Sequence, residues 1–269
     1  MNTKPNRPTI IITGASAGIG AAAARKLATD ARVIIVGRSE ATKAVADEIG
    51  AEYFRADFAD LTSVRKLAED LLRVCPRIDL LVNNAGGIMS TIAKTKDGFE
   101  TTFQVNYLAQ FLLTNLLMDR LITSKAGIIN TSSVANQRAK LSLDDLQAAA
   151  SPFDAYANGK LLDIMHAKQL SRRYAAKGVT AVSFHPGVVA TNFASETSGI
   201  FAIIYNTPLK RLLISPDQGA DTLVWLAQNR SSWQPGGYYV KRKLARFNSV
   251  ASDANNLTAA WDETTALIR

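Results

Sequence analysis

The chain has 269 residues, of which 47% are hydrophobic, and its 31 lysines and arginines outnumber its 23 aspartates and glutamates, for a formal net charge of +8. This length and apolar content suffice for a sizeable core and exclude an intrinsically disordered chain. A single cysteine, Cys75, excludes an internal disulfide framework and a cysteine-held metal centre, and it favours a reducing, cytoplasmic setting.

Short β-branched segments alternate with longer amphipathic segments, which is typical of repeated strand–helix–strand units around a parallel sheet. Strands are predicted at Thr9–Thr13, Arg32–Val36, Glu52–Phe54, Ile78–Val82, Gly127–Thr131 and Thr180–Phe184. Helices are predicted at Ile19–Thr29, Thr42–Ile49, Leu61–Arg73, Phe99–Asp119, Asp154–Ala176, Pro216–Gln228 and Asn256–Ile268. No linker or repeat divides the chain, so we expect one doubly wound α/β domain over residues 1–269, with a mainly parallel sheet and flanking helices.

The charge pattern bears on possible macromolecular partners. The net positive charge would suit a nucleic acid or an anionic membrane, but the basic residues are scattered, and the one dense run, 241–243 with Arg246, is typical of a solvated face. No stretch approaches the roughly 18 apolar residues needed to cross a bilayer, and the N-terminal segment lacks the apolar part of a secretory signal. We expect no nucleic-acid partner and no transmembrane segment.

A glycine-rich segment, Thr13-Gly14-Ala15-Ser16-Ala17-Gly18-Ile19-Gly20, joins the first predicted strand to the first helix. Glycines let the chain turn tightly and approach a diphosphate, and the helix N-terminus supplies amide donors and the positive end of a dipole. This context indicates a dinucleotide site. The cofactor-binding residues predicted in the segment are Gly14, Ser16, Ala17, Gly18, Ile19 and Gly20.

The same segment also matches the Gly-x-Ser-x-Gly nucleophile elbow of α/β-hydrolases. Ser16 would be the nucleophile, and Asp163 and His185 follow it in the required order. The elbow would then stand after the very first strand, which leaves no earlier strands to build the central sheet and the oxyanion loop. A serine hydrolase is therefore the weaker alternative.

Three motifs in order resemble the short-chain dehydrogenase/reductase family. The glycine-rich segment looks like its cofactor-binding turn, Asn83-Asn84-Ala85-Gly86 looks like its sheet-stabilising NNAG segment, and Tyr156-x-x-x-Lys160 is similar to its catalytic YxxxK. The resemblance implies a Rossmann-type fold, a nicotinamide cofactor contacted by Asn84 among others, and hydride transfer between a carbonyl and an alcohol.

Tyr156 and Lys160 lie four residues apart, so their side chains share one face of a helix. A phenol with a free pKa near ~10 is a poor acid–base group at neutral pH, and a nearby cation favours the phenolate. The resemblance implies that Tyr156 exchanges a proton with the substrate, and that Lys160 binds the nicotinamide ribose and tunes Tyr156.

The resemblance also implies catalytic roles for Ser133 and Asn106. Ser133 would hydrogen-bond the substrate oxygen, with Ser132 as the alternative, because both serines follow the fifth predicted strand. Asn106 would hold a water in the proton relay. An unpaired amide in the otherwise apolar helix around Asn106 would cost about 1 to 3 kcal/mol, so a buried partner is expected there.

Arg38 bears on the choice of cofactor. It follows the second predicted strand, where an NAD enzyme usually places a carboxylate for the ribose 2′-hydroxyl. A planar guanidinium suits a 2′-phosphate instead, so NADP is the predicted cofactor. The resemblance adds Asp57 at the adenine edge, and Val189 and Thr191 at the nicotinamide carboxamide.

The substrate prediction depends on two segments. The spacing of 23 residues between Ser133 and Tyr156 is longer than is common in the family, and the insert around 143–147 resembles the retinol dehydrogenase-like branch. The apolar segment 192–214 stands where the family builds its substrate lid. We therefore expect a small-molecule lipophilic aldehyde, ketone or alcohol, with retinoid-like or steroid-like candidates. Core packing and a weak membrane contact are the alternatives for this segment.

The sequence also bears on metal binding, on a non-catalytic function and on the oligomeric state. His166 lies within a predicted helix and has no partner at metal-ligand spacing, so no metal site is predicted, and His185 is expected to be structural. A non-catalytic NADP-binding regulator is the other alternative function, against which the retained serine, tyrosine, lysine and asparagine argue. Family members often pair through the helices that hold Phe103 and Tyr156, so a homo-oligomer is possible by analogy.

Overall fold

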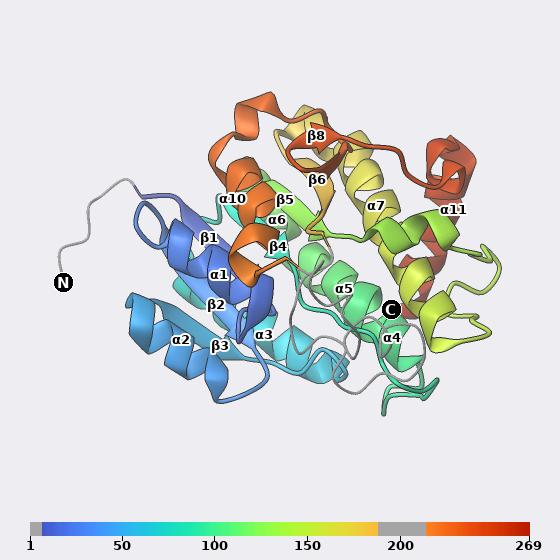
Figure 1. Cartoon of the computed structure of the whole chain (residues 1–269), viewed down its shortest axis with the longest axis horizontal. Coiled ribbons are helices and arrows are strands. Elements are labelled where there is room, and N and C mark those ends of the chain that lie inside the picture. The colour runs from blue at the N-terminus through green and yellow to red at the C-terminus, as the bar shows by residue number, and fades with distance from the viewer. Residues whose placement is uncertain (1–6, 188–213) are drawn as a thin grey trace.

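The structure, a computed structural model, describes residues 7–187 and 214–269. In these residues eight strands form one sheet in the order β3-β2-β1-β4-β5-β6-β7-β8 (Figure 1). Neighbouring strands are parallel, except that β8 runs antiparallel to β7. The strands are β1 Thr9–Thr13, β2 Arg32–Gly37, β3 Glu52–Arg55, β4 Leu80–Asn83, β5 Gly127–Thr131, β6 Thr180–His185, β7 Tyr238–Val240 and β8 Lys243–Leu244.

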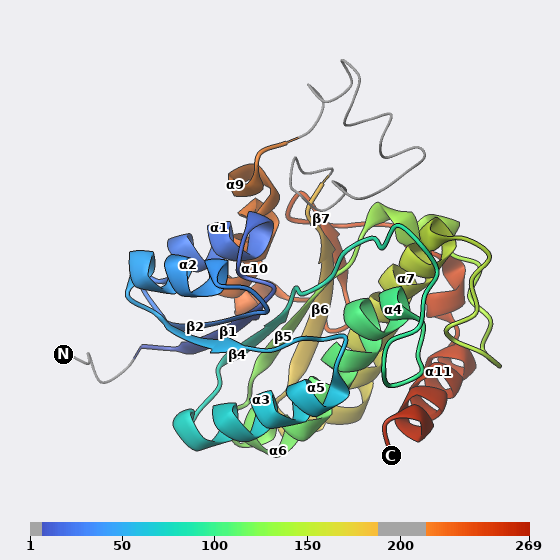
Figure 2. The same ribbon diagram turned by 90° about the horizontal axis from the view of Figure 1, so that it is seen from below.

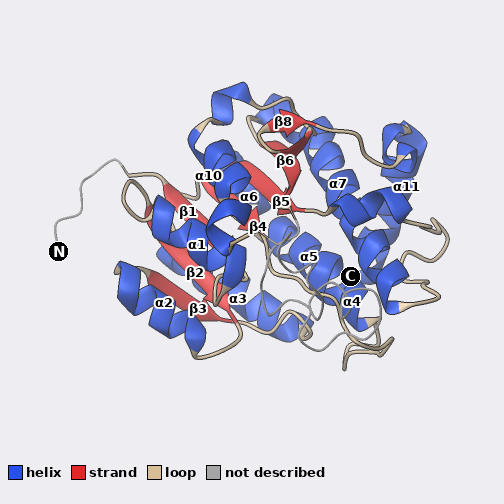
Figure 3. Ribbon diagram, in the orientation of Figure 1, coloured by secondary structure: helices blue, strands red, loops and turns tan. Residues whose placement is uncertain are grey.

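Helices cover both faces of this sheet. They are α1 Gly18–Leu27, α2 Ala41–Ile49, α3 Leu61–Val74, α4 Thr101–Phe103, α5 Ala109–Leu116, α6 Met118–Thr123, α7 Pro152–Tyr174, α9 Pro216–Gly219, α10 Asp221–Gln228 and α11 Ala254–Leu267. Figure 2 shows α1, α2, α9 and α10 on one side of the sheet, and α3, α5 and α6 on the other. The predicted doubly wound α/β fold with a mainly parallel sheet is confirmed (Figure 3).

The central strands are buried on both faces, which explains their continuous apolar sequences. All five residues of β1 are buried. Its alternate side chains divide between two cores: Ile11 packs in the core of α3, α5 and α7, whereas Ile10 and Ile12 pack in the core of α1, α2 and α10. This period of two is the reason why a short apolar run predicts a strand here.

Two predicted helices are interrupted in the structure. The helix expected over Phe99–Asp119 consists of α4, a π-helical turn at Gln104–Leu108, α5 and α6. The helix expected over Pro216–Gln228 divides at Ala220 into α9 and α10. A π-helical turn adds a residue to the helical turn and often marks a functional site. Asn106 lies within this turn.

The sheet order reverses beside β1, which pairs with β2 on one side and β4 on the other. Connections from these strands therefore leave in opposite directions, and a crevice forms outside their carboxyl ends. Strands β5 and β6 continue the sheet next to β4, so the loops that follow them reach the same edge.

Candidate active site

A cavity of about 530 Å³ lies at the carboxyl ends of the parallel strands. Its walls bring together most of the residues predicted for the site: Gly14, Ser16, Ala17, Gly18, Ile19, Gly20, Arg38, Asp57, Asn84, Ser133, Tyr156 and Lys160. Val189, Thr191 and the segment 192–214, except for Ile214, lie outside the described residues. Their assignments therefore stay predictions from the sequence.

The glycine-rich turn has the backbone geometry that its sequence demands. Gly14 has φ +66°, and a Cβ at this position would lie 2.6 Å from the Cα of Ala85. A Cβ on Gly20 would lie 2.5 Å from the carbonyl oxygen of Gly14. The helix α1 then begins at Gly18 without a side-chain cap on its first amides. Free amide donors at a helix N-terminus suit a diphosphate, so the turn fits a dinucleotide.

The environment of Ser16 does not support the hydrolase alternative. A hydrolase triad needs its serine, histidine and acid in hydrogen-bond contact. In the structure the Ser16 hydroxyl pairs with the Thr42 hydroxyl at 2.8 Å, and the Asp163 carboxylate pairs with Lys160. His185 Nδ1 has no hydrogen-bond partner within the described part of the chain. The three residues therefore do not form a triad.

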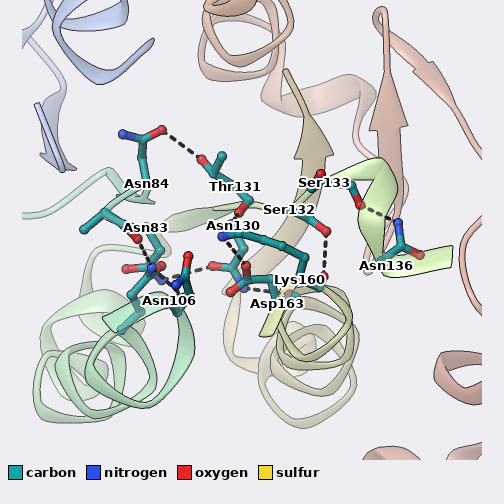
Figure 4. A network of polar contacts seen from close by, with 12 residues as sticks. Asn83, Asn84, Asn106, Asn130, Thr131, Ser132, Ser133, Asn136, Lys160 and Asp163 are labelled. Atoms are coloured by element: carbon teal, nitrogen blue, oxygen red, sulfur yellow. Dashed lines mark hydrogen bonds and ion pairs between the residues drawn. The ribbon is translucent and has the colours of Figure 1, made fainter. Parts of the chain in front are cut away.

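Asn84 joins the ends of three strands beneath the cavity. Its amide nitrogen donates to the carbonyl oxygens of Thr13 and Gly14, at 3.0 and 3.2 Å. Its Oδ1 accepts a hydrogen bond of 3.1 Å from the Thr131 hydroxyl (Figure 4). The preceding Asn83 donates to Asn130 Oδ1 at 3.0 Å. The two asparagines thereby fix β1, β4 and β5 relative to one another at the cavity floor.

The two serines after β5 have different hydrogen bonds. The Ser132 hydroxyl donates to the backbone oxygen of Lys160 at 2.6 Å, so its hydrogen is committed to α7. The Ser133 Oγ accepts from the backbone N–H of Ala135 at 3.2 Å. A hydroxyl that accepts this bond keeps its own hydrogen for a ligand. The geometry therefore favours Ser133 over Ser132 as the serine that would meet a substrate.

Tyr156 and Lys160 project from α7 toward the cavity. The Lys160 ammonium lies 5.7 Å from the centre of the Tyr156 ring. It donates to the Thr131 carbonyl oxygen at 2.8 Å and to Asp163 Oδ2 at 3.0 Å. Sequence reasoning placed Asp163 only in the hydrolase alternative. Its spacing of three residues after Lys160 on one helix was the signal for this contact.

Asn106 lies behind the cavity wall, within the π-helical turn. Its Nδ2 donates to the backbone oxygens of Gly87 and Thr102 at 2.8 and 2.9 Å, and its Oδ1 accepts from the Gly87 N–H at 3.0 Å. The buried partner expected from the sequence is thus a loop backbone. A Cβ on Gly86 would lie 2.5 Å from Asn106 Oδ1 and 3.5 Å from Lys160 Nζ, so this loop fills the space between Asn106 and Lys160.

Arg38 is an exposed cation at the rim of the cavity, directly after β2. Within the described ranges it forms no ion pair, and the neighbouring Glu40 is bound to Arg55. Asp57, which follows β3, also lines the cavity, and its Oδ1 accepts from the Ala59 N–H at 3.0 Å. The rim therefore presents an uncompensated guanidinium that an anionic group can reach.

The histidines show no features of a metal centre. Burial lowers the pKa of His166 to about 3, and its ring packs against Phe111 and Trp261. Burial also lowers the pKa of His185, to about 4. The described residues contain no group of three or more His, Cys, Asp or Glu side chains that could hold a metal ion.

The fold agrees with the comparison to known proteins. The sequence profile of the short chain dehydrogenase family matches residues 8–199. The chain belongs to the short-chain dehydrogenase/reductase family and to its retinol dehydrogenase-like branch, as the sequence motifs predicted. It is therefore an oxidoreductase of a family that binds a nicotinamide dinucleotide.

Particular relatives cover nearly the whole chain. A Streptomyces sp. (strain C5) protein with the provisional name daunorubicin C-13 ketoreductase DnrU is 39% identical over 272 residues, which are 97% of this chain and 92% of that protein. Mouse (Mus musculus) retinol dehydrogenase 12 is 34% identical over 273 residues, 96% of this chain and 85% of that protein. The crystal structure of an uncharacterised Mycobacterium paratuberculosis protein superposes with a TM-score of 0.78 at 30% identity, and covers 97% of this chain and 93% of that one.

No helix within 7–187 or 214–269 is long and apolar enough to cross a bilayer.

Proposed function

We propose that the protein uses NADP(H) to interconvert a carbonyl and an alcohol on a lipophilic small molecule. The observation that carries this proposal is the arrangement of one cavity. Ser133, Tyr156 and Lys160 line part of its wall, and the glycine-rich turn and Arg38 line another part. An acid–base pair and a dinucleotide cradle in one cavity suit hydride transfer.

The proposed cofactor contacts follow from the chemistry of each group. The free amides at the start of α1 would hold the diphosphate, and Arg38 would bind the 2′-phosphate with its guanidinium. Asp57 would contact the adenine, and Asn84 and Lys160 would lie near the ribose and nicotinamide. We also propose contacts from Val189 and Thr191 to the carboxamide, on sequence resemblance alone. The bound cofactor supplies the hydride.

The protein side chains would handle the substrate oxygen and its proton. In the reducing direction Ser133 donates a hydrogen bond to the carbonyl oxygen, and Tyr156 transfers its phenolic proton to that oxygen. The phenolate left on Tyr156 is stabilised by the Lys160 ammonium, 5.7 Å from the ring centre. Asn106 would support the proton relay by binding the Gly87 backbone and so holding the loop whose Gly86 lies beside Lys160. In the oxidising direction each proton moves the opposite way.

The lipophilic substrate is supported by the surroundings of Tyr156. Ile88, Ala135 and Ala157 form an apolar cluster with Tyr156, and Ile88 and Met89 line the cavity. Apolar walls with few polar groups at the reacting end suit a carbon-rich carbonyl compound. The names of the relatives, which refer to retinol and to the C-13 ketone of daunorubicin, point the same way. Retinoid-like and steroid-like compounds are the first candidates.

The test is a panel of carbonyl compounds with the purified protein, followed at the NADPH absorbance band. We expect turnover of lipophilic aldehydes or ketones with NADPH, and loss of that turnover in Tyr156→Phe. Tight NADPH binding with no turnover of any panel member or corresponding alcohol would instead favour the non-catalytic regulator.

A further inference from the structure

Asp163 is a buried carboxylate that the proposed mechanism does not use. Its side chain is 2% exposed, and its Oδ2 lies 3.0 Å from Lys160 Nζ, one turn earlier on α7. Lys160 also donates to the Thr131 carbonyl oxygen at the end of β5. Figure 4 shows Asp163 beside Lys160, below the end of β5. Two of the three hydrogens of the Lys160 ammonium are thus donated to acceptors within the protein.

Lys160 is the charged group whose field acts on Asp163. His166, on the same helix, is neutral because burial lowers its pKa to about 3. Tyr107, in the π-helical turn, also interacts electrostatically with Asp163. Burial raises the pKa of Tyr107, so its phenol is neutral as well. From β5, Asn130 donates to the backbone oxygen of Asp163 at 3.0 Å rather than to the carboxylate. Burial raises the pKa of Asp163 to about 7, and the Lys160 ammonium opposes the rise.

This pairing changes what Lys160 presents to Tyr156. An isolated ammonium near the phenol would favour the phenolate with a full unit of positive charge. A carboxylate 3.0 Å from the ammonium turns that charge into a short dipole, whose field falls off faster with distance. At the alkaline pH where a phenol ionises, Asp163 is ionised and this cancellation operates.

We propose that Asp163 is a positioning residue, which holds the Lys160 ammonium against the end of β5 and offsets part of the positive charge that Lys160 presents to Tyr156. The proposal rests on the proposed function, because it gives Tyr156 the role of the acid–base group. It assigns the tuning of that group to three residues of α7, namely Tyr156, Lys160 and Asp163, rather than to two.

The test uses Asp163→Asn, which keeps the size of the side chain and an oxygen for Lys160 but removes the charge. The ionisation of Tyr156 is followed by tyrosinate absorbance, as the difference between each protein and the same protein carrying Tyr156→Phe. We expect Tyr156 to ionise about one pH unit lower in Asp163→Asn than in the wild type. Asp262→Asn, which removes an exposed carboxylate on α11, is the matched control and should leave the titration unchanged.

Coincident titrations of the wild type and Asp163→Asn, or a shift to higher pH, would overturn the proposal. If Asp163 had a purely structural role, Asp163→Asn would lower the thermal unfolding temperature but leave the titration of Tyr156 unchanged. That outcome would also overturn the proposal. If Asp163→Asn did not fold, Asp163→Ser, with room for a water beside Lys160, carries the same test.

Turnover gives a second readout. If the enzyme oxidises an alcohol, the pH profile of kcat in Asp163→Asn should move in the same direction as the tyrosinate titration, while KM for the alcohol changes little. Absence of turnover with every substrate would remove the proposed function, whereas the absorbance titration needs no turnover and would still decide the role of Asp163.

Discussion

The hydroxyl of Ser132 donates a 2.6 Å hydrogen bond to the backbone oxygen of Lys160, and so ties the end of β5 to the middle of α7. Both groups are buried. This contact fixes the segment that follows β5 and carries Ser133 relative to the helix that carries Tyr156. Both serines line the cavity, but the Ser132 hydroxyl donates to Lys160, whereas the Ser133 Oγ accepts from the Ala135 N–H.

Substitution of each serine should therefore have a different effect. We expect Ser133→Ala to lower kcat/KM by roughly 100-fold, a typical loss for one donor to a reacting oxygen, with little change in stability. Ser132→Ala leaves the Lys160 carbonyl without this donor and should cost about 1 kcal/mol of unfolding free energy. Steady-state kinetics and chemical denaturation of the two variants check the assignment. A larger kinetic loss in Ser132→Ala would reverse the roles.

Arg38→Ala should remove the preference for NADPH. The guanidinium is exposed at the rim and has no carboxylate partner in the described residues, so its charge is available to a 2′-phosphate. We expect affinity for NADPH to fall at least tenfold and affinity for NADH to stay nearly unchanged. Isothermal titration of both cofactors measures this, with Arg55→Ala as the control for loss of a nearby cation. Equal wild-type affinities for NADPH and NADH would reject the assignment.

Asn106→Ala should destabilise the loop beside the site. The substitution removes the acceptor for the Gly87 N–H and two donated hydrogen bonds. Loss of buried partners of this kind costs about 1 to 3 kcal/mol. We expect a lower unfolding free energy together with reduced kcat. Unchanged stability with reduced kcat would mean that Asn106 acts on the relay alone.

The buried carboxylate predicts a pH dependence of stability. Burial raises the pKa of Asp163 from 3.8 to about 7 in the folded chain. The folded state then binds the proton more tightly than the unfolded state, so this group reduces stability as pH rises through that interval. We expect the wild type to lose stability relative to Asp163→Asn between about pH 4 and pH 7. Unfolding at several pH values checks this, and parallel stability curves for the two proteins would contradict it.

The parts of the fold that repeat a simple pattern could be predicted from the sequence. β1 and β5 have the predicted bounds because they are buried on both faces and bordered by glycine or turn residues. The π-helical turn could not be predicted, because Asn106 there binds Gly87, which lies far away along the chain. The three residues of β7 and the two of β8 are too few to show a period.

The candidate site, like the fold, could be predicted only in part from the sequence. Motif spacing was sufficient to place Tyr156 and Lys160 at one cavity, because helical geometry alone brings them together. The choice between Ser132 and Ser133 needed hydrogen-bond partners, which the sequence does not contain. The ion pair between Lys160 and Asp163 could not be recognised without knowing that both side chains are buried. An acidic residue three positions after a lysine is common on solvated helices, and the 2% exposure of the Asp163 side chain distinguishes this pair.

We propose Tyr156 as the group that exchanges the proton in an NADPH-dependent carbonyl reduction. The most direct measurement is single-turnover oxidation of bound NADPH by a lipophilic aldehyde, compared between the wild type and Tyr156→Phe, with NADPH affinity measured on both. We expect Tyr156→Phe to bind NADPH as the wild type does and to lose at least 100-fold in the rate, because the phenyl ring keeps the packing but has no proton to give. A Tyr156→Phe rate close to the wild-type rate would show that Tyr156 is not the proton donor.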